Sequence, residues 1–287
     1  MKRMLSLLCL GVVGHAASAQ DSARVLRDVE YAVVDAISLK LDLYLPDAPD
    51  LPTLIVWVHG GAWRSGSKDR VAIEDMLQRG FAIASVDYRL TPVAPFPANV
   101  HDIKAAIRFL RARADHFGYR KEPFVIAGAS AGGHLAALVG VSNGHAALEG
   151  TVGEYKDQSS DIAAIVSFYG AGNLTTILKQ STPHGLGVRV PALQLLLGGS
   201  PEELPAKAKL ASPVFHADAS DPPLILIHGD QDPQMPINQS HELHGVYKRL
   251  GLPVHFEVVY GGGHGGAPFF DRERLDLVHD FLRKHLD

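Results

Sequence analysis

One serine of this chain stands in the setting that a fold uses to present a nucleophile. Ser130 lies between two glycines in the pattern G-x-S-x-G, after the apolar run 124–127 and before a segment of small residues. At a tight strand-to-helix turn the serine backbone is strained, and glycines, which lack Cβ, let neighbouring elements approach closely. A helix beginning after the serine would bring backbone N–H groups, including that of Ala131, near the reacting centre. Taken alone, the pattern also fits an ordinary Gly/Ser loop.

A second segment offers backbone hydrogen-bond donors. The apolar run 54–58 is followed by the sequence His-Gly-Gly-Ala-Trp at residues 59–63. Glycines free the backbone to turn its N–H groups toward a ligand, as stabilising a developing oxyanion requires. Together with Ala131, this segment would supply the donors of an oxyanion hole. A glycine turn without such a role is the alternative.

A nucleophilic serine needs a base, and the base needs a carboxylate to hold its tautomer and stabilise its charged form. Asp230 and Asp232 follow the apolar run 224–227, and His264 lies in a glycine-rich loop after the run 254–259. The chain order of serine, acid and histidine, each after a strand, is the order of the α/β arrangement. The residues themselves leave both aspartates open as the acid. With fifteen histidines in the chain, a purely structural histidine is the alternative for His264.

The elements that must position these residues alternate along the chain. Residues 39–45 alternate apolar and polar with period two, which predicts an antiparallel strand with one buried face, in a strand region that starts at Val29. Apolar residues recur at helical spacing in 100–110, 243–250 and 275–282. Continuous apolar runs, typical of strands covered on both faces, lie at 54–58, 81–86, 124–127, 163–168, 224–227 and 254–259. The sequence therefore predicts an α/β fold, a mostly parallel eight-stranded twisted sheet with helices on both faces and its ligand site at the carboxyl ends of the strands.

One stretch interrupts this alternation. Between the runs 163–168 and 224–227 the chain is rich in Gly and Pro and has an apolar cluster at 193–197. We expect residues 170–215, approximately, to form a small cap insertion over the carboxyl edge of the sheet. A plain surface excursion is the alternative. Residues 20–287 are otherwise predicted to be a single catalytic domain.

The first residues have the pattern of a secretory signal. Lys2 and Arg3 precede the apolar run 4–13, and the small residues Ala-Ser-Ala follow at 17–19. The pattern predicts a signal peptide at 1–19 and a secreted or periplasmic protein. A buried N-terminal helix is the alternative, and the apolar run is too short to span a membrane.

Composition narrows the class of protein further. The chain has 287 residues, 46% of them hydrophobic, and a formal net charge of −4, so a nucleic-acid partner is not expected. Its only cysteine, Cys9, lies in the predicted signal, which leaves a mature chain without disulfides, a thiol nucleophile or cysteine-bound metal. His241 and His244 have the wrong spacing for the zinc motif H-E-x-x-H. We expect neither a metal nor a cofactor.

The chain resembles the α/β-hydrolase superfamily over essentially all of its predicted mature length. More narrowly it resembles the secreted esterases and lipases grouped with acetyl-xylan and feruloyl esterases, which are similar to the hormone-sensitive-lipase group. The resemblance rests on residues 59–63, 86–90 with 95–97, 128–133, 228–232 and 263–265. It implies that Asp232, the second aspartate of H-G-x-x-D, is the acid, and that Gly61 and Ala62 join Ala131 in the oxyanion hole.

Two departures favour the acetyl and feruloyl esterase side of this group. Ala62 stands where the hormone-sensitive-lipase group has a third glycine, and the first strand begins too early for that group's N-terminal helical cap. Trp63 is expected to line the acyl pocket, with a packed aromatic as the alternative. The expected function is a secreted serine carboxylesterase acting on short-chain acyl (acetyl) or feruloyl esters, as small molecules or on plant cell-wall carbohydrate. A serine peptidase or amidase and a non-catalytic binding module are the alternatives.

Overall fold

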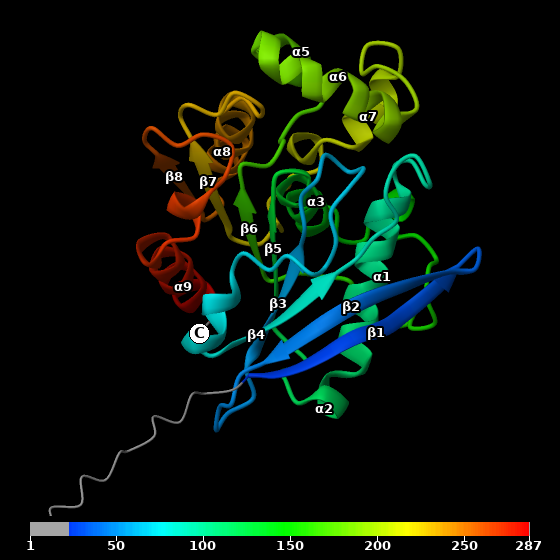
Figure 1. Cartoon of the computed structure of the whole chain (residues 1–287), viewed down its shortest axis with the longest axis vertical. Coiled ribbons are helices and arrows are strands. Elements are labelled where there is room, and N and C mark those ends of the chain that lie inside the picture. Colours follow the sequence, from blue (N-terminus) through cyan, green and yellow to red (C-terminus); the bar gives the residue numbers. More distant parts are fainter. Residues whose placement is uncertain (1–22, 287) are drawn as a thin grey trace, which may run out of the picture.

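The described residues, 23–286 of a computed structural model, form one sheet of eight strands (Figure 1). The signal peptide predicted for residues 1–19, with Cys9, lies outside them. The spatial order is β1-β2-β4-β3-β5-β6-β7-β8. The strands are β1 (Arg24–Val34), β2 (Ile37–Leu45), β3 (Thr53–Val58), β4 (Phe81–Val86), β5 (Phe124–Ala129), β6 (Ala164–Phe168), β7 (Leu224–Gly229) and β8 (Val254–Val259).

The strand directions bring the loops that carry the candidate site residues to one edge of the sheet. β1 pairs antiparallel with β2, and β2 antiparallel with β4, whereas the pairs from β4 through β8 are all parallel. The carboxyl ends of β3, β5, β7 and β8 therefore meet at the same edge. The predicted mostly parallel, eight-stranded α/β sheet is confirmed.

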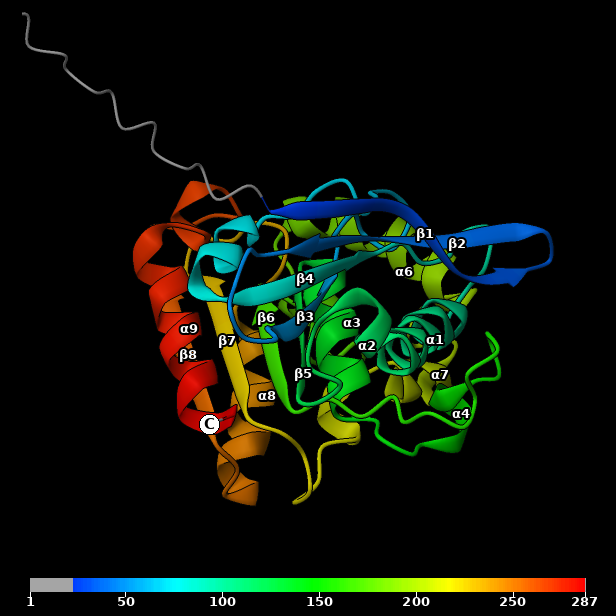
Figure 2. The same cartoon turned by 90° about the horizontal axis from the view of Figure 1, so that it is seen from below.

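Most of the continuous apolar runs form strands buried on both faces, because the sheet separates two hydrophobic cores. The run 254–259 differs from the prediction, since β8 lies at the edge of the sheet and all of its residues except Val259 are only partly buried. In β3, Leu54, Val56 and Val58 belong to one core, and Ile55 and Trp57 to the other. Helices cover both faces, as Figure 2 shows. The first core is covered by α1 (Ala98–Ala112), α3 (Ala131–Gly140) and α8 (Asn238–Leu250), and the second by α9 (Arg272–Leu286) and the 3₁₀ turn at Glu74–Arg79. The short helices α2 (Ala114–Phe117) and α4 (Ala146–Glu149) complete the side of α1.

Strand β2 is buried on both faces over its second half, whereas the alternating pattern predicts only one buried face. Asp42 points away from the leucine face yet is fully buried. It accepts hydrogen bonds from Lys68 Nζ at 2.9 Å, Arg27 Nη1 at 2.7 Å and the backbone N–H of Asp28 at 2.8 Å. Burial raises the pKa of this carboxyl, but the donors, Lys68 foremost, outweigh burial and hold the pKa below its ordinary value. The loop that carries Lys68 covers a face that the alternating pattern predicts to be exposed.

The segment between β6 and β7 carries three helices, α5 (Ile177–Gln180), α6 (Pro183–Leu197) and α7 (Pro205–Leu210). Figure 1 shows them beyond the sheet on the side toward which the parallel strands point. Helix α6 starts sharply because Pro183 stands at its first position and Thr182 Oγ1 accepts from Gly185 N at 3.0 Å. Among the described residues, no helix is long and apolar enough to cross a bilayer.

Candidate active site

Ser130 occupies the turn from β5 into α3. Its backbone has φ 55° and ψ −118°, a conformation that residues with a side chain rarely adopt. The Ser130 N–H donates to Phe168 O at 2.9 Å, which ties the turn to β6. Gly132 allows the tight turn, because a Cβ there would lie 2.0 Å from Val58 O of β3. The structure thus has the strand-to-helix turn that the G-x-S-x-G pattern predicts.

The loops after β7 and β8 bring Asp232 and His264 to this serine. Ser130 Oγ lies 2.9 Å from His264 Nε2, and His264 Nδ1 lies 2.6 Å from Asp232 Oδ2. Because Nδ1 faces a carboxylate, it carries the ring hydrogen and leaves Nε2 free to accept the serine hydroxyl proton. Three of the sequence-predicted residues therefore form one continuous hydrogen-bonded line.

Asp232 is held in place and kept ionised by its surroundings. Its second oxygen, Oδ1, accepts from the backbone N–H groups of Gln234 and Met235, both at 2.8 Å. Burial raises the pKa of Asp232, but the hydrogen bonds from His228, His264 and the Met235 N–H outweigh it and hold the pKa well below the ordinary value. The carboxyl is therefore charged at any pH near neutrality.

Asp230 is not part of the hydrogen-bonded line from Ser130 through His264 to Asp232. Its Oδ1 accepts from the backbone N–H of Gly261 at 2.7 Å, so it ties the loop after β7 to the loop after β8. No described hydrogen bond joins Asp230 to His264. The structure thus shows that Asp232, and not Asp230, contacts His264, a choice that the residues alone leave open.

His228, the first residue of the H-G-x-x-D motif, lies beside Asp232, a role that was not assigned to it from the sequence. Its Nε2 lies 3.0 Å from Met235 O and 3.4 Å from Asp232 Oδ2, and its Nδ1 lies 2.7 Å from Ser240 Oγ. Since Nε2 faces only acceptors, it carries the hydrogen, and Nδ1 accepts from the serine hydroxyl. This fully buried imidazole adds a donor beside the carboxylate.

Backbone N–H groups converge near Ser130 from two directions. Gly61 and Ala62 have φ 118° and 52°, so the chain turns back on itself after β3. The N–H groups of Gly61, Ala62 and Ala131 have no backbone acceptor in the described part of the chain. Gly61 and Ala62 line the cavity that contains Ser130, and Ala131 begins α3 directly after it. Unpaired N–H groups at this place suit an oxyanion.

Trp63 does not line the cavity as expected. It is fully buried, is absent from the cavity wall, and its Nε1–H donates to His134 Nδ1 at 3.1 Å. His134 Nε2 in turn lies 2.7 Å from Ala211 O, and burial lowers the pKa of this imidazole to about 4, so it stays neutral. The alternative interpretation, a packed aromatic, describes Trp63 correctly.

A cavity of about 950 Å³ opens over Ser130 and His264. Two of its lining residues were not singled out from the sequence. Tyr169 follows β6 with φ 40° and packs its ring edge-on against His264, the centroids 4.9 Å apart. Arg189 comes from α6, in the segment between β6 and β7, and its neighbour Val188 also lines the cavity. Tyr169 could have been found as the residue that follows a predicted strand, whereas nothing local marks Arg189.

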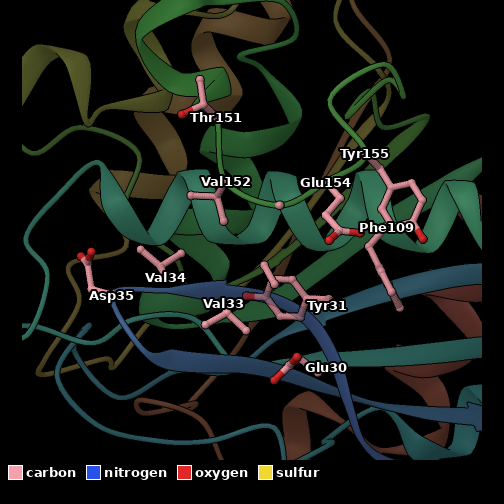
Figure 3. Close-up of a pocket in the computed structure, with 12 residues that line it drawn as sticks. Glu30, Tyr31, Val33, Val34, Asp35, Phe109, Thr151, Val152, Glu154 and Tyr155 are labelled. Atoms are coloured by element: carbon pink, nitrogen blue, oxygen red, sulfur yellow. The ribbon is translucent and has the colours of Figure 1, made fainter.

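A second cavity, of about 650 Å³, lies beside β1 (Figure 3). Its walls include Glu30 and Asp35 of the first hairpin and Glu154 of the loop beyond α4. It has no serine, histidine, lysine or arginine on its walls. Ser130 and His264, the candidate nucleophile and base, line the first cavity.

The chain is similar to several known proteins. Among solved structures, the truncated form of a carbohydrate esterase from gut microbiota is 31% identical, with a TM-score of 0.84 over 94% of this chain and 98% of that one. Esterase LipC of Mycobacterium tuberculosis is 30% identical over 75% of this chain and 54% of its own. The isoprenylcysteine alpha-carbonyl methylesterase ICME of Arabidopsis thaliana is 31% identical over 91% of this chain and 62% of its own. The chain spans about half the length of curated relatives that it matches, such as LipC.

The fold, the site and these relatives place the chain in the esterase class of α/β-hydrolases. Within that class a family model identifies it further. Residues 41–247 match the BD-FAE family, and the chain belongs to that family. The matched range includes Ser130 and Asp232 and ends before His264.

Proposed function

We propose that this chain hydrolyses carboxylic esters through a covalent acyl-enzyme. His264 Nε2 takes the proton of Ser130 as Oγ attacks the ester carbonyl carbon. Asp232 holds the imidazole in the required tautomer and stabilises its charged form. The imidazolium then gives its proton to the leaving alcohol oxygen, and water, activated by the same imidazole, releases the acid. The reaction needs no cofactor.

The observation that carries this proposal is the hydrogen-bonded line from Ser130 Oγ through His264 to Asp232, with separations of 2.9 and 2.6 Å. Within the proposal, the N–H groups of Gly61, Ala62 and Ala131 hold the oxyanion. The strain stored in the Ser130 backbone supports the same role, because an unfavourable φ persists where the surrounding structure imposes it, as at active sites.

For the substrate we propose either a short-chain acyl (acetyl) ester or a feruloyl ester, with a carbohydrate as one source of the alcohol. The similar solved structure is that of a carbohydrate esterase, which supports a sugar alcohol. A cavity of about 950 Å³ has room for an acyl group and part of a sugar.

Replacing Ser130 by alanine tests the proposed function. In Ser130→Ala the hydrolysis of p-nitrophenyl acetate should fall by at least about 10³-fold while the fold is retained, because no nucleophile remains. The matched control is Ser38→Ala, at an exposed serine of the first hairpin, which should keep the parental rate. Methyl ferulate, acetylated xylan and a p-nitroanilide, assayed alongside, separate acetyl, feruloyl and amide hydrolysis. Substantial turnover by Ser130→Ala would rule out the acyl-enzyme.

We further propose that the chain is exported, on the strength of the charged start, apolar run and small residues at 1–19. N-terminal sequencing of the protein recovered from the periplasm or the medium should begin at Gln20. A cytoplasmic protein that still starts at Met1 would contradict export.

A further inference from the structure

A guanidinium with one unpartnered nitrogen lines the cavity that contains Ser130. The Arg189 side chain lies on α6 and is 1% exposed. Its Nε donates to Gln234 O at 3.2 Å, and its Cζ lies 5.9 Å from the centre of the Trp63 ring. Its Nη1 is buried without a hydrogen-bond partner, and no described carboxylate forms an ion pair with it. Buried charges in proteins are normally paired and fully hydrogen-bonded, so this donor is available to a ligand.

A second guanidinium lines the same cavity. Arg64 follows the Gly61–Ala62 turn, is exposed, and has no ion pair among the described residues. Burial lowers the pKa of Arg189 to about 10, the charge of Asp232 opposes this shift, and the charge of Arg64 adds to it. Arg70 also lines the cavity, whereas no aspartate or glutamate does. Like charges that converge on one space destabilise each other until an anion enters it.

The positive lining of the Ser130 cavity contrasts with the charge of the whole chain and with the cavity in Figure 3. The chain as a whole has a net charge of −4. The cavity in Figure 3 has the opposite character, because Glu30, Asp35 and Glu154 line it with no lysine or arginine. A general excess of basic residues therefore does not account for the arginines around Ser130.

We propose that the substrate of this site carries a carboxylate, which Arg189 and Arg64 bind while Ser130 attacks the ester. The substrate is then either a hemiester of a dicarboxylic acid or an ester of an alcohol that bears a carboxylate, such as an acylated sugar acid. A planar guanidinium with a free Nη suits a carboxylate, since it offers parallel N–H donors. This inference rests on the proposed ester hydrolysis and names the substrate class of the same site.

Two matched pairs of esters test the inference and distinguish its two forms. The carboxylate lies on the acid part in p-nitrophenyl hydrogen glutarate, whose neutral match is p-nitrophenyl valerate. It lies on the alcohol part in p-acetoxybenzoate, whose neutral match is p-acetoxybenzamide. We expect kcat/KM to favour the charged member of one pair by about 10-fold or more, and to do so less as salt rises.

The variants report on the two arginines. Arg189→Gln should lower the charged-to-neutral ratio by about 10- to 100-fold, and exposed Arg64→Gln, which leaves the core intact, by about 3-fold or more. Arg189→Lys should recover only part of the preference, because ammonium lacks the planar pair of donors. The control is Arg272→Gln on α9, an equal change of net charge at a side chain that is 92% exposed, and it should leave the ratio unchanged.

A binding measurement makes the inference testable without turnover. Glutarate and p-hydroxybenzoate should be titrated calorimetrically into the Ser130→Ala protein, with and without Arg64→Gln, and Arg64→Gln should weaken the binding of one of them. The inference is overturned if the neutral ester is preferred in both pairs, or if neither arginine variant changes the ratio. Neutral esters would still be hydrolysed in that case, and the proposed function would stand. If no ester is hydrolysed the proposed function fails, and the titration alone decides whether the site binds carboxylates.

Discussion

Replacing Asp232 by asparagine should nearly abolish activity by trapping His264 in the wrong tautomer. The backbone N–H groups of Gln234 and Met235 point at Oδ1 from 2.8 Å, so the asparagine carbonyl oxygen must take that place. Its NH₂ group then occupies the position of Oδ2, 2.6 Å from His264 Nδ1. The amide donates to Nδ1, the ring hydrogen moves to Nε2, and Nε2 no longer accepts the proton of Ser130.

The size of the loss follows from the interactions that the reacting state would lose. Restoring the productive tautomer removes a charge-assisted hydrogen bond, worth about 1.5–3 kcal/mol, and leaves two donors facing each other, at about 1–3 kcal/mol. The barrier therefore rises by about 3–6 kcal/mol, and kcat/KM for p-nitrophenyl acetate should fall by about 10²–10⁴-fold.

The matched control for this prediction is Asp230→Asn. Asp230 accepts from Gly261 N, and an asparagine oxygen at the same place keeps that hydrogen bond, so kcat/KM should stay within about threefold of the parent. The reasoning is refuted if Asp232→Asn retains a rate within about tenfold of the parent, or if Asp230→Asn falls as far.

Three further predictions concern stability, each measured by denaturant unfolding. Burial raises the pKa of Asp221 to about 6, whereas the unfolded chain releases this proton near 3.8, so stability falls as pH rises through that window. Asp221→Asn should therefore stabilise the fold by about 1–2 kcal/mol at pH 7 and not at pH 3; equal stability at pH 7 would contradict this. Glu149 accepts a hydrogen bond from the buried Lys104, and this bond holds the pKa of Glu149 below 4.5 although burial raises it. Glu149→Gln should therefore lower the free energy of unfolding by about 3–5 kcal/mol. That stabilisation is present above pH 4.5 and is lost as pH falls, so an equal loss at pH 3 and pH 7 would count against it. Gly132→Ala should lower the free energy of unfolding by at least about 3 kcal/mol, because the new Cβ would lie 2.0 Å from a β3 carbonyl oxygen. The control is Gly187→Ala on α6, where a Cβ meets nothing within 4 Å, and it should leave stability unchanged or raise it.

Much of the fold could be predicted because its signals are local. An apolar run such as 124–127 is a strand wherever helices cover both faces of the sheet, and the parallel order brings the carboxyl ends of such strands to one edge. Ser130 and His264 could be singled out for the same reason, since each follows a strand in a glycine-rich turn. Their 2.9 Å contact joins positions 134 residues apart and is a property of the sheet.

The sequence by itself determined which elements form, in what order, and which turns could hold a nucleophile, a base and an acid. The family resemblance pointed to Asp232 rather than Asp230, but only the tertiary structure shows which carboxylate reaches His264, because that contact depends on packing against the loop after β8. The tertiary structure also buries Trp63 and places Arg189 on the wall of the cavity that contains Ser130. Burial and the direction of a side chain depend on neighbours from distant segments, such as the Trp63–His134 contact across 71 positions, and no local pattern records those neighbours.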